Sequence, residues 1–321
     1  MKSKVVSVAY PTIPIIFVAS VNDKRIPLHD TAGLAVTDLK GETKSQTTII
    51  VDSSRDKTIF LLEGQRVDAR RELDINRVVE VFANESGKSG IALRIESINT
   101  NIYSGSSDSG AAALVVGLNR LFGTNFSLGR LAQLGNQISE SAGRSVFGGM
   151  NQYIVSEGEP FGRQIASEQE LAGIRIFAMG FDYESRVSAQ QIFDVCKVSP
   201  FWQMRVDKIP YWRREVEEGL TQKDWKRVFA NAEENCANAH YLIENGGLRP
   251  RRKEMMEAVI AIEDIRREDN LSVYWTAGGG KVINAFSWDP EAEKVLELLR
   301  GKGQNPVEYK VASGAQVISI E

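Results

Sequence analysis

The positions of apolar and polar residues divide the chain into short strand-like runs and longer helical stretches. Apolar and polar residues nearly alternate over residues 92–100, which predicts a strand buried on one face. Further strands are predicted at residues 5–9, 12–19, 47–51, 58–62, 152–156, 174–180, 272–276, 282–286 and 316–320. Helices are predicted at residues 69–84, 114–122 and 128–138, over 188–267 with breaks near 199–200 and 246–247, and at 290–299. This mixture predicts an α+β fold.

A run of small residues precedes the helix predicted at residues 114–122 and follows the strand predicted at 92–100. Its first members are Ser104, Gly105, Ser106, Ser107, Asp108, Ser109 and Gly110. A helix N-terminus offers N–H groups without partners and the positive end of the helix dipole, and small residues let an anion approach the backbone. The pattern indicates a phosphate-binding loop, and the alternative is an ordinary N-cap on a buried alanine-rich helix.

A second glycine-rich segment lies near the C-terminus, at residues 278–280. The strands predicted on either side of it, 272–276 and 282–286, are expected to pair antiparallel. This pairing brings Thr276 to a tight turn with few side chains, where a ligand can approach the backbone.

Bulk composition excludes several classes of protein. The chain has 321 residues and a net charge of −3, with scattered basic residues and no electrostatic footprint for nucleic acid. The basic run at 249–253 is expected to be a solvated helix start, with phosphate binding or a subunit contact as alternatives. Two cysteines are too few for a disulfide framework and favour a reducing cytoplasm. No signal-peptide core and no stretch near the ~18 apolar residues of a membrane span occurs, so no membrane partner is expected.

Four motifs occur in an order typical of one enzyme family. They are AYPTIPII at residues 9–16 with IPLHDTAG at 26–33, the small-residue run at 104–113, SESAGRSVFGG at 139–149, and TAGGG at 276–280. Together they resemble the GHMP kinase superfamily, specifically its mevalonate diphosphate decarboxylase branch, over almost the whole chain. The resemblance implies a two-lobed GHMP-kinase-like fold, with antiparallel or mixed sheets and flanking helices around a central cleft. It also implies an N-terminal nucleotide-phosphate-binding lobe at residues 1–180, similar to ribosomal S5 domain 2, and a C-terminal GHMP-type lobe at residues 181–321.

Departures from the decarboxylase pattern indicate which reaction the chain catalyses. Phe17 stands where the decarboxylases have a lysine, Glu140 where they usually have a glycine, and Thr276 where they have an aspartate beside the 3-hydroxyl of mevalonate. Threonine cannot deprotonate a hydroxyl as aspartate can, which disfavours an ordinary decarboxylase. Phosphoryl transfer depends mainly on positioning and charge neutralisation, so a kinase tolerates the absence of the aspartate.

With Arg186, these departures are similar to the archaeal kinases of the branch, which phosphorylate the 3-hydroxyl of mevalonate and stop there. The alternative within the family is an ATP-independent mevalonate 3,5-bisphosphate decarboxylase or a related (di)phosphomevalonate decarboxylase. A non-catalytic protein with the same fold is a third possibility, which the coherent polar set at Ser106, Ser107, Glu140 and Arg144 disfavours.

Roles for individual residues follow from the resemblance. It implies ATP and Mg²⁺ as cofactors, mevalonate or a phosphomevalonate as substrate, and a homodimer. It also implies that residues 104–110 bind the phosphates, that Ser107, Arg144 and Thr276 are catalytic, and that Ser107 is a metal ligand. Substrate binding is implied for Phe17, His29, Ser139, Glu140, Arg144, Ser145 and Arg186.

Several of these residues also have a purely structural interpretation. Asp108 either binds Mg²⁺ or caps the helix. Phe17 fits a core aromatic at a strand end, and His29 fits a structural hydrogen bond. The Thr276 hydroxyl can instead bond its own backbone in the turn.

Overall fold

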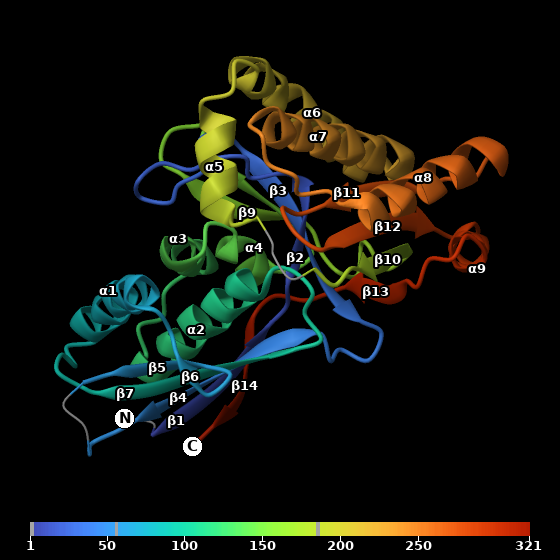
Figure 1. Ribbon diagram of the computed structural model, residues 1–321. Helices are drawn as coiled ribbons and strands as arrows, with labels where there is room; N and C mark the ends of the chain where they lie inside the picture. Colours follow the sequence, from blue (N-terminus) through green and yellow to red (C-terminus); the bar gives the residue numbers. More distant parts are fainter. Residues whose placement is uncertain (1–2, 55–56, 184–186) are drawn as a thin grey trace.

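The computed structural model describes residues 3–54, 57–183 and 187–321, and within them the chain forms two sheets covered by helices (Figure 1). The first sheet has six strands in the order β14 (Gln316–Ile320), β1 (Lys4–Ala9), β4 (Lys44–Val51), β7 (Leu93–Thr100), β5 (Ile59–Leu62) and β6 (Gln65–Arg66). The second has the order β11 (Tyr274–Ala277), β12 (Val282–Trp288), β10 (Ile174–Gly180), β13 (Val307–Val311), β3 (Thr31–Asp38), β8 (Met150–Ile154) and β9 (Phe161–Ala166), with β2 (Thr12–Ile16) paired to β3.

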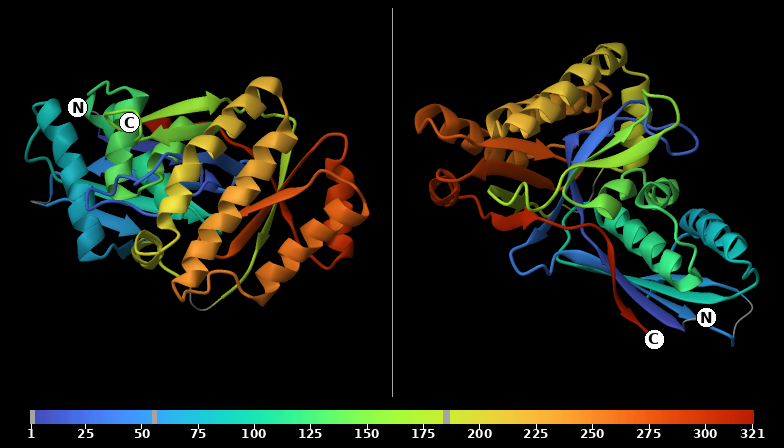
Figure 2. Two further views of the ribbon diagram at one scale, coloured as in Figure 1. Left: turned by 90° about the horizontal axis from the view of Figure 1, so that it is seen from above. Right: turned by 180° about the vertical axis from the view of Figure 1, so that it is seen from behind.

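Helices cover one face of the first sheet and both faces of the second. Helix α2 (Ser106–Phe122) lies on β1 and β4, and α1 (Ala69–Glu85), α3 (Leu128–Ile138) and α4 (Ala142–Phe147) pack beside it. Helices α6 (Trp202–Gln222) and α7 (Trp225–Asn245) run side by side on the second sheet (Figure 2). On the other face lie α8 (Lys253–Glu268) and α9 (Ala292–Gly301), while α5 (Ala189–Lys197) contacts α7.

Small residues bring α2 close to the first sheet. A Cβ on Gly117 would lie 2.8 Å from the Ser7 Oγ and 2.8 Å from the Ile49 Cδ1, so both side chains would have to shift for any other residue. The Ser7 Oγ donates a hydrogen bond of 2.6 Å to the carbonyl of Ala113, which fixes the helix along β1. This packing sets the position of the N-terminus of α2, which points toward the second sheet.

The predicted α+β fold is confirmed, and most predicted elements are present. The prediction for the start of α2 was wrong, because the helix begins at Ser106 and most of the small-residue run forms its first turns. The alanines of the run favour the helix. The helix cannot extend further toward the N-terminus because Gly105 has a left-handed φ of 81°. Strand β3 was missed because seven of its eight residues are buried, which removes the alternation of apolar and polar positions. A further break at Lys223, with φ 55°, separates α6 from α7.

In both sheets, strands from before residue 180 pair with strands from after it. Strand β14 pairs with β1, and β13 pairs with β3, so each sheet contains strands from both halves of the chain. The boundary between lobes at residue 180 stays a prediction. In the described part of the chain, every helix is too short or too polar to cross a lipid bilayer.

Candidate active site

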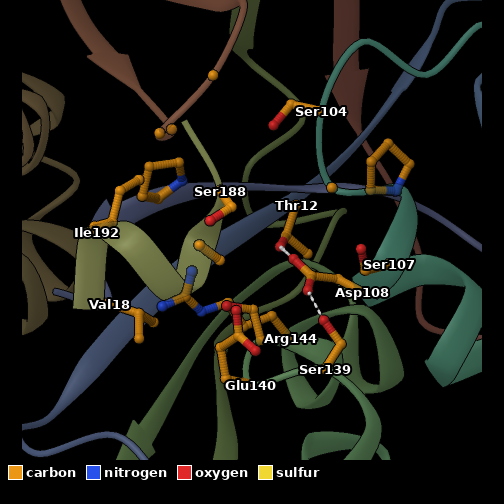
Figure 3. A pocket seen from close by; sticks show the side chains of 18 of the residues that line it. Thr12, Val18, Ser104, Ser107, Asp108, Ser139, Glu140, Arg144, Ser188 and Ile192 are labelled. Atoms are coloured by element: carbon orange, nitrogen blue, oxygen red, sulfur yellow. Dashed lines mark hydrogen bonds between the residues drawn. The ribbon is translucent and has the colours of Figure 1, made fainter. Parts of the chain in front are cut away.

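A cavity of about 450 Å³ lies between the two sheets, at the N-terminus of α2 (Figure 3). Its wall is formed by the start of β2 and residues 17–18, the start of α2, residues 138–144, the start of α5 and the glycine turn 278–280. A Cβ on Gly279 would collide with the end of the Ile192 side chain of α5, so this helix and the glycine turn lie in close contact at the cavity. The predicted site residues on the wall are Phe17, Ser104, Gly105, Ser107, Asp108, Ser139, Glu140 and Arg144.

Contacts with β2 and with the Ser109 hydroxyl hold the loop before α2 in one conformation. Besides its left-handed φ, Gly105 lies so close to β2 that a Cβ would be 3.1 Å from the backbone nitrogen of Thr12. The hydroxyl of Ser109 donates to the Gly105 carbonyl at 3.2 Å and lies 2.7 Å from the Ser45 hydroxyl. Ser107 is exposed to the cavity. The first turn of α2 therefore presents backbone N–H groups and a hydroxyl to the cavity, which suits a phosphate.

Asp108 lies in the same turn, with its carboxylate toward the cavity floor. The Ser139 Oγ donates to one carboxylate oxygen at 2.7 Å and the Thr12 Oγ1 to the other at 3.3 Å, as Figure 3 shows. Burial, and next the charge of Glu140, raise the pKa of Asp108 to about 6. The N-cap alternative was wrong: Gly105 is the N-cap of α2, and no side chain caps it.

Arg144 is a buried arginine whose guanidinium faces the cavity. Its Nη2 donates to the carbonyl of Ile16 at 3.3 Å, and its own carbonyl accepts from the Asn151 Nδ2 at 2.9 Å. Burial lowers the pKa of Arg144 to about 10, against the raising effect of Asp108 and Glu140, so it remains a cation at neutral pH. Within the described residues, no carboxylate is close enough to form an ion pair with it. A planar donor fork of this kind suits the carboxylate of a ligand.

Glu140 forms an ion pair that the sequence did not indicate. Its partner is Arg25, and the side chains of Arg25 and Glu140 are only 22% and 11% exposed. The two residues are 115 positions apart, and no local pattern predicts that they meet.

Other predicted residues lie off the cavity wall. Thr276 is fully buried in β11, and its hydroxyl finds no partner among the described residues. The His29 ring packs against Trp202, and its Nδ1 lies 2.8 Å from the carbonyl of Asp30; burial lowers its pKa to about 3. The Ser145 Oγ donates to the carbonyl of Tyr10 at 2.7 Å.

For these residues, and for Ser106, Ser109 and Gly110, the assigned roles stay predictions. Arg186 lies outside the described residues.

The wall also contains residues that the sequence analysis did not select: Tyr103, Ser188, Asn284 and Tyr309. Of these, Ser188 carried a local signal, because it begins α5 as the first residue of a capping box.

The basic run at residues 249–253 contributes nothing to the cavity wall. Arg251 forms two hydrogen bonds of 2.8 Å with Glu244, and the Arg252 guanidinium lies 5.8 Å from the ring centre of Tyr183. Arg251 is thus half-buried in an ion pair, whereas Arg252 contacts Tyr183 and remains exposed.

The chain is similar to known proteins over its full length. Residues 9–160 match the family model of the diphosphomevalonate decarboxylase-like N-terminal domain. The mevalonate-3-kinase of Picrophilus torridus is 26% identical over 318 residues, which cover 97% of this chain and 96% of the relative. The mevalonate 3-kinase of Thermoplasma acidophilum is 26% identical over 316 residues, covering 96% of each chain.

Solved structures share the fold. The crystal structure of the Thermoplasma acidophilum mevalonate-3-kinase bound to mevalonate 3-phosphate and ADP superposes with a TM-score of 0.89 at 23% identity, covering 100% of both chains. That of the mevalonate diphosphate decarboxylase from Staphylococcus aureus gives 0.88 at 19% identity, covering 99% of each. The fold is therefore the one shared by these mevalonate-3-kinase and mevalonate diphosphate decarboxylase structures. The match of residues 9–160 to the diphosphomevalonate decarboxylase-like N-terminal domain confirms the resemblance found in the motifs.

Proposed function

We propose that this chain is an ATP-dependent kinase that transfers phosphate to the 3-hydroxyl of mevalonate. One observation carries the proposal: the guanidinium of Arg144, buried and without an ion-pair partner in the described residues, faces the same cavity as the first turn of α2. An acceptor with a carboxylate and a nucleotide with phosphates can thus be bound side by side. The two relatives named as mevalonate 3-kinases, each aligned over more than nine tenths of this chain, support the same activity.

The nucleotide phosphates bind at the N-terminus of α2 in this proposal. The backbone N–H groups and the Ser107 hydroxyl bind the phosphate oxygens. The Ser107 hydroxyl and the Asp108 carboxylate are oxygen donors of the kind that Mg²⁺ prefers, so these residues fit the ion. When bound, the metal neutralises phosphate charge. Related solved structures hold ADP in one case, and AMPPCP with magnesium in another.

The acceptor binds on the other side of the cavity. Arg144 holds its carboxylate, and Glu140 accepts a hydrogen bond from the 5-hydroxyl. Because Thr276 cannot act as a base, transfer relies on positioning of the 3-hydroxyl toward the bound phosphate. Without an aspartate at this position we expect the 3-phosphate to be released intact rather than eliminated with CO₂.

A decarboxylase of a 5-phosphorylated substrate is the second candidate. The phosphomevalonate decarboxylase of Haloferax volcanii is 22% identical over 305 residues, which cover 92% of this chain. Incubating the protein with ATP, Mg²⁺ and either mevalonate or 5-phosphomevalonate, identifying the product by phosphorus NMR and measuring CO₂ release, separates the two. A 3-phosphate ester without CO₂ supports the kinase, whereas CO₂ released from a phosphorylated mevalonate supports the decarboxylase.

Replacement of Glu140 by serine is expected to weaken the use of mevalonate and to relax discrimination against 5-phosphomevalonate. The hydrogen bond from the 5-hydroxyl to a carboxylate is worth roughly 1.5–3 kcal/mol, whereas a phosphate there would meet a like charge. Measuring kcat/KM for both acceptors in both proteins tests this. An unchanged ratio in Glu140→Ser would mean that Glu140 does not contact the 5-position.

Replacement of Gly33 by alanine is expected to raise KM for mevalonate on the order of tenfold. A Cβ at this position would lie 3.0 Å from the Arg144 Nε and closer still to its Cδ, so the guanidinium must shift. Gly173→Ala is the control, because a Cβ there meets nothing within 4 Å. Steady-state kinetics of both variants, with nucleotide affinity by calorimetry, check the effect. Equal KM values in the two variants would contradict it.

Assembly, location and domain division complete the proposal. The family resemblance supports a cytoplasmic homodimer with lobes at residues 1–180 and 181–321. Analytical ultracentrifugation of the purified protein tests the dimer.

A further inference from the structure

Residues 22–26 form a small turn that is ordered by its own hydrogen bonds. The Asn22 Oδ1 accepts from the backbone N–H of Lys24 at 2.9 Å and from that of Ile26 at 3.0 Å, while the Asn22 N–H donates to the Ile26 carbonyl at 2.9 Å. Arg25 stands at the tip with a left-handed φ of 60°. The turn thus holds Arg25 in a fixed place at the cavity.

The guanidinium of Arg25 contacts Glu140 on the cavity wall. Its Nη2 donates to the Glu140 Oε2, and both side chains are largely removed from solvent. The Arg25 Nε is buried and has no hydrogen-bond partner among the described residues. A buried donor without a partner is costly unless a ligand satisfies it.

The Arg25–Glu140 pair offers a ligand both a hydrogen-bond donor and a hydrogen-bond acceptor, and the two opposite charges neutralise each other. Glu140 can accept a hydrogen bond, and the terminal N–H groups of the Arg25 guanidinium that do not bind Glu140 can donate one. A hydroxyl group uses both because it donates and accepts. A phosphate only accepts, and it would have to compete with Glu140 for the guanidinium and sit beside its carboxylate.

We propose that Arg25 is a specificity-determining residue, which with Glu140 selects an acceptor that has an uncharged hydroxyl at this end of the cavity. The inference rests on the proposed function and adds a second residue to the recognition of the 5-position. In the absence of ligand, Glu140 neutralises Arg25, which would otherwise attract a phosphate.

A double-substitution cycle tests the inference, with mevalonate and 5-phosphomevalonate as the two acceptors. Glu140→Gln frees the Arg25 cation, and we expect the ratio of kcat/KM values to shift toward the phosphorylated acceptor by about 10- to 100-fold. Adding Arg25→Met should abolish most of that shift. Arg25→Lys in place of Arg25→Met keeps the charge and should retain part of it. Arg25→Met alone should lower kcat/KM for mevalonate about tenfold, mainly through KM.

Arg94→Met is the matched control, because Arg94 forms an exposed ion pair with Glu96 on the first sheet. It should leave the acceptor ratio unchanged. Melting temperatures of all variants separate misfolding from altered recognition. If Glu140→Gln and the double variant show the same ratio, Arg25 does not select the acceptor and the inference is wrong.

Dissociation constants for the two acceptors, measured by calorimetry in the same variants, distinguish this failure from that of the proposed function. If the unmodified protein makes no 3-phosphate but the cycle appears in the dissociation constants, the kinase proposal fails and the inference on Arg25 holds. If the product forms and the cycle is absent, the inference alone fails. If neither acceptor binds, both are wrong.

Discussion

Arg144→Lys is expected to lower kcat/KM for mevalonate by a factor on the order of 10², with nucleotide affinity unchanged. Lysine keeps the positive charge but loses the planar fork that binds a carboxylate through two parallel hydrogen bonds. It also loses the Nη2 that donates to the carbonyl of Ile16, so the residues at the end of β2 lose a contact that positions them. An acceptor held in the wrong place loses proximity to the phosphate as well as binding energy.

Steady-state kinetics with mevalonate, and calorimetric titration with ADP, measure the two halves of this prediction. Arg163→Lys is a suitable control, because Arg163 forms a partly exposed ion pair with Glu217 outside the cavity. Kinetics of Arg144→Lys close to those of the unmodified protein would remove Arg144 from the acceptor site. Loss of ADP affinity in the same variant would instead indicate a general collapse of the cavity.

The local pattern of apolar and polar residues predicted most of the fold. It was insufficient for strands that are buried on both faces. Strand β7 was predicted from its alternation, which survives because one face of the first sheet is only partly covered. Strand β3 lies between helices and other strands and has almost no exposed position, so nothing in its sequence separates it from a buried helix. The start of α2 was misplaced because serine and glycine are typical of loops, whereas packing on β1 extends the helix to Ser106.

Residues of the candidate site were predictable where they belong to a short motif of the sequence. Asp108 and Ser139 came from two motifs, and the structure joins them by a hydrogen bond. Phe17 shows the limit of such reasoning. Its N–H donates to the Asn235 Oδ1 at 2.9 Å and its carbonyl accepts from the Arg205 Nη2 at 2.9 Å. The backbone of Phe17 is therefore held by α6 and α7, two hundred residues later, and only the tertiary structure brings these groups together.

Burial also decides which motif residues reach the cavity. Thr276 and the glycine turn 278–280 belong to one motif, but of these the glycines line the wall, together with Val282 and Asn284 of the facing strand. Thr276 pairs directly with Asn284 across the two strands, so both side chains lie on the same face of the sheet, and it is burial that keeps Thr276 off the wall. The same holds for His29, whose ring packs into the protein against Trp202.

Gly105→Val is expected to raise the dissociation constant for ADP on the order of 100-fold. The left-handed φ of 81° is strained for a β-branched residue, and a Cβ would lie 3.1 Å from the backbone nitrogen and 3.2 Å from the carbonyl oxygen of Thr12. Backbone atoms of β2 cannot yield as a flexible side chain can, so the start of α2 must move. Its N–H groups and the Ser107 hydroxyl then no longer meet the phosphates.

Gly123→Val separates this effect from a general loss of stability. Gly123 ends the same helix with φ 72°, and a Cβ there meets nothing within 4 Å. Both variants therefore carry a left-handed valine, with a cost in the free energy of unfolding of about 1–2 kcal/mol or more, but only one disturbs the cavity. Calorimetry with ADP and thermal unfolding should show lower melting temperatures in both and weakened binding in Gly105→Val alone. Unchanged ADP affinity in Gly105→Val, in a folded protein, would place the nucleotide phosphates elsewhere than at the N-terminus of α2.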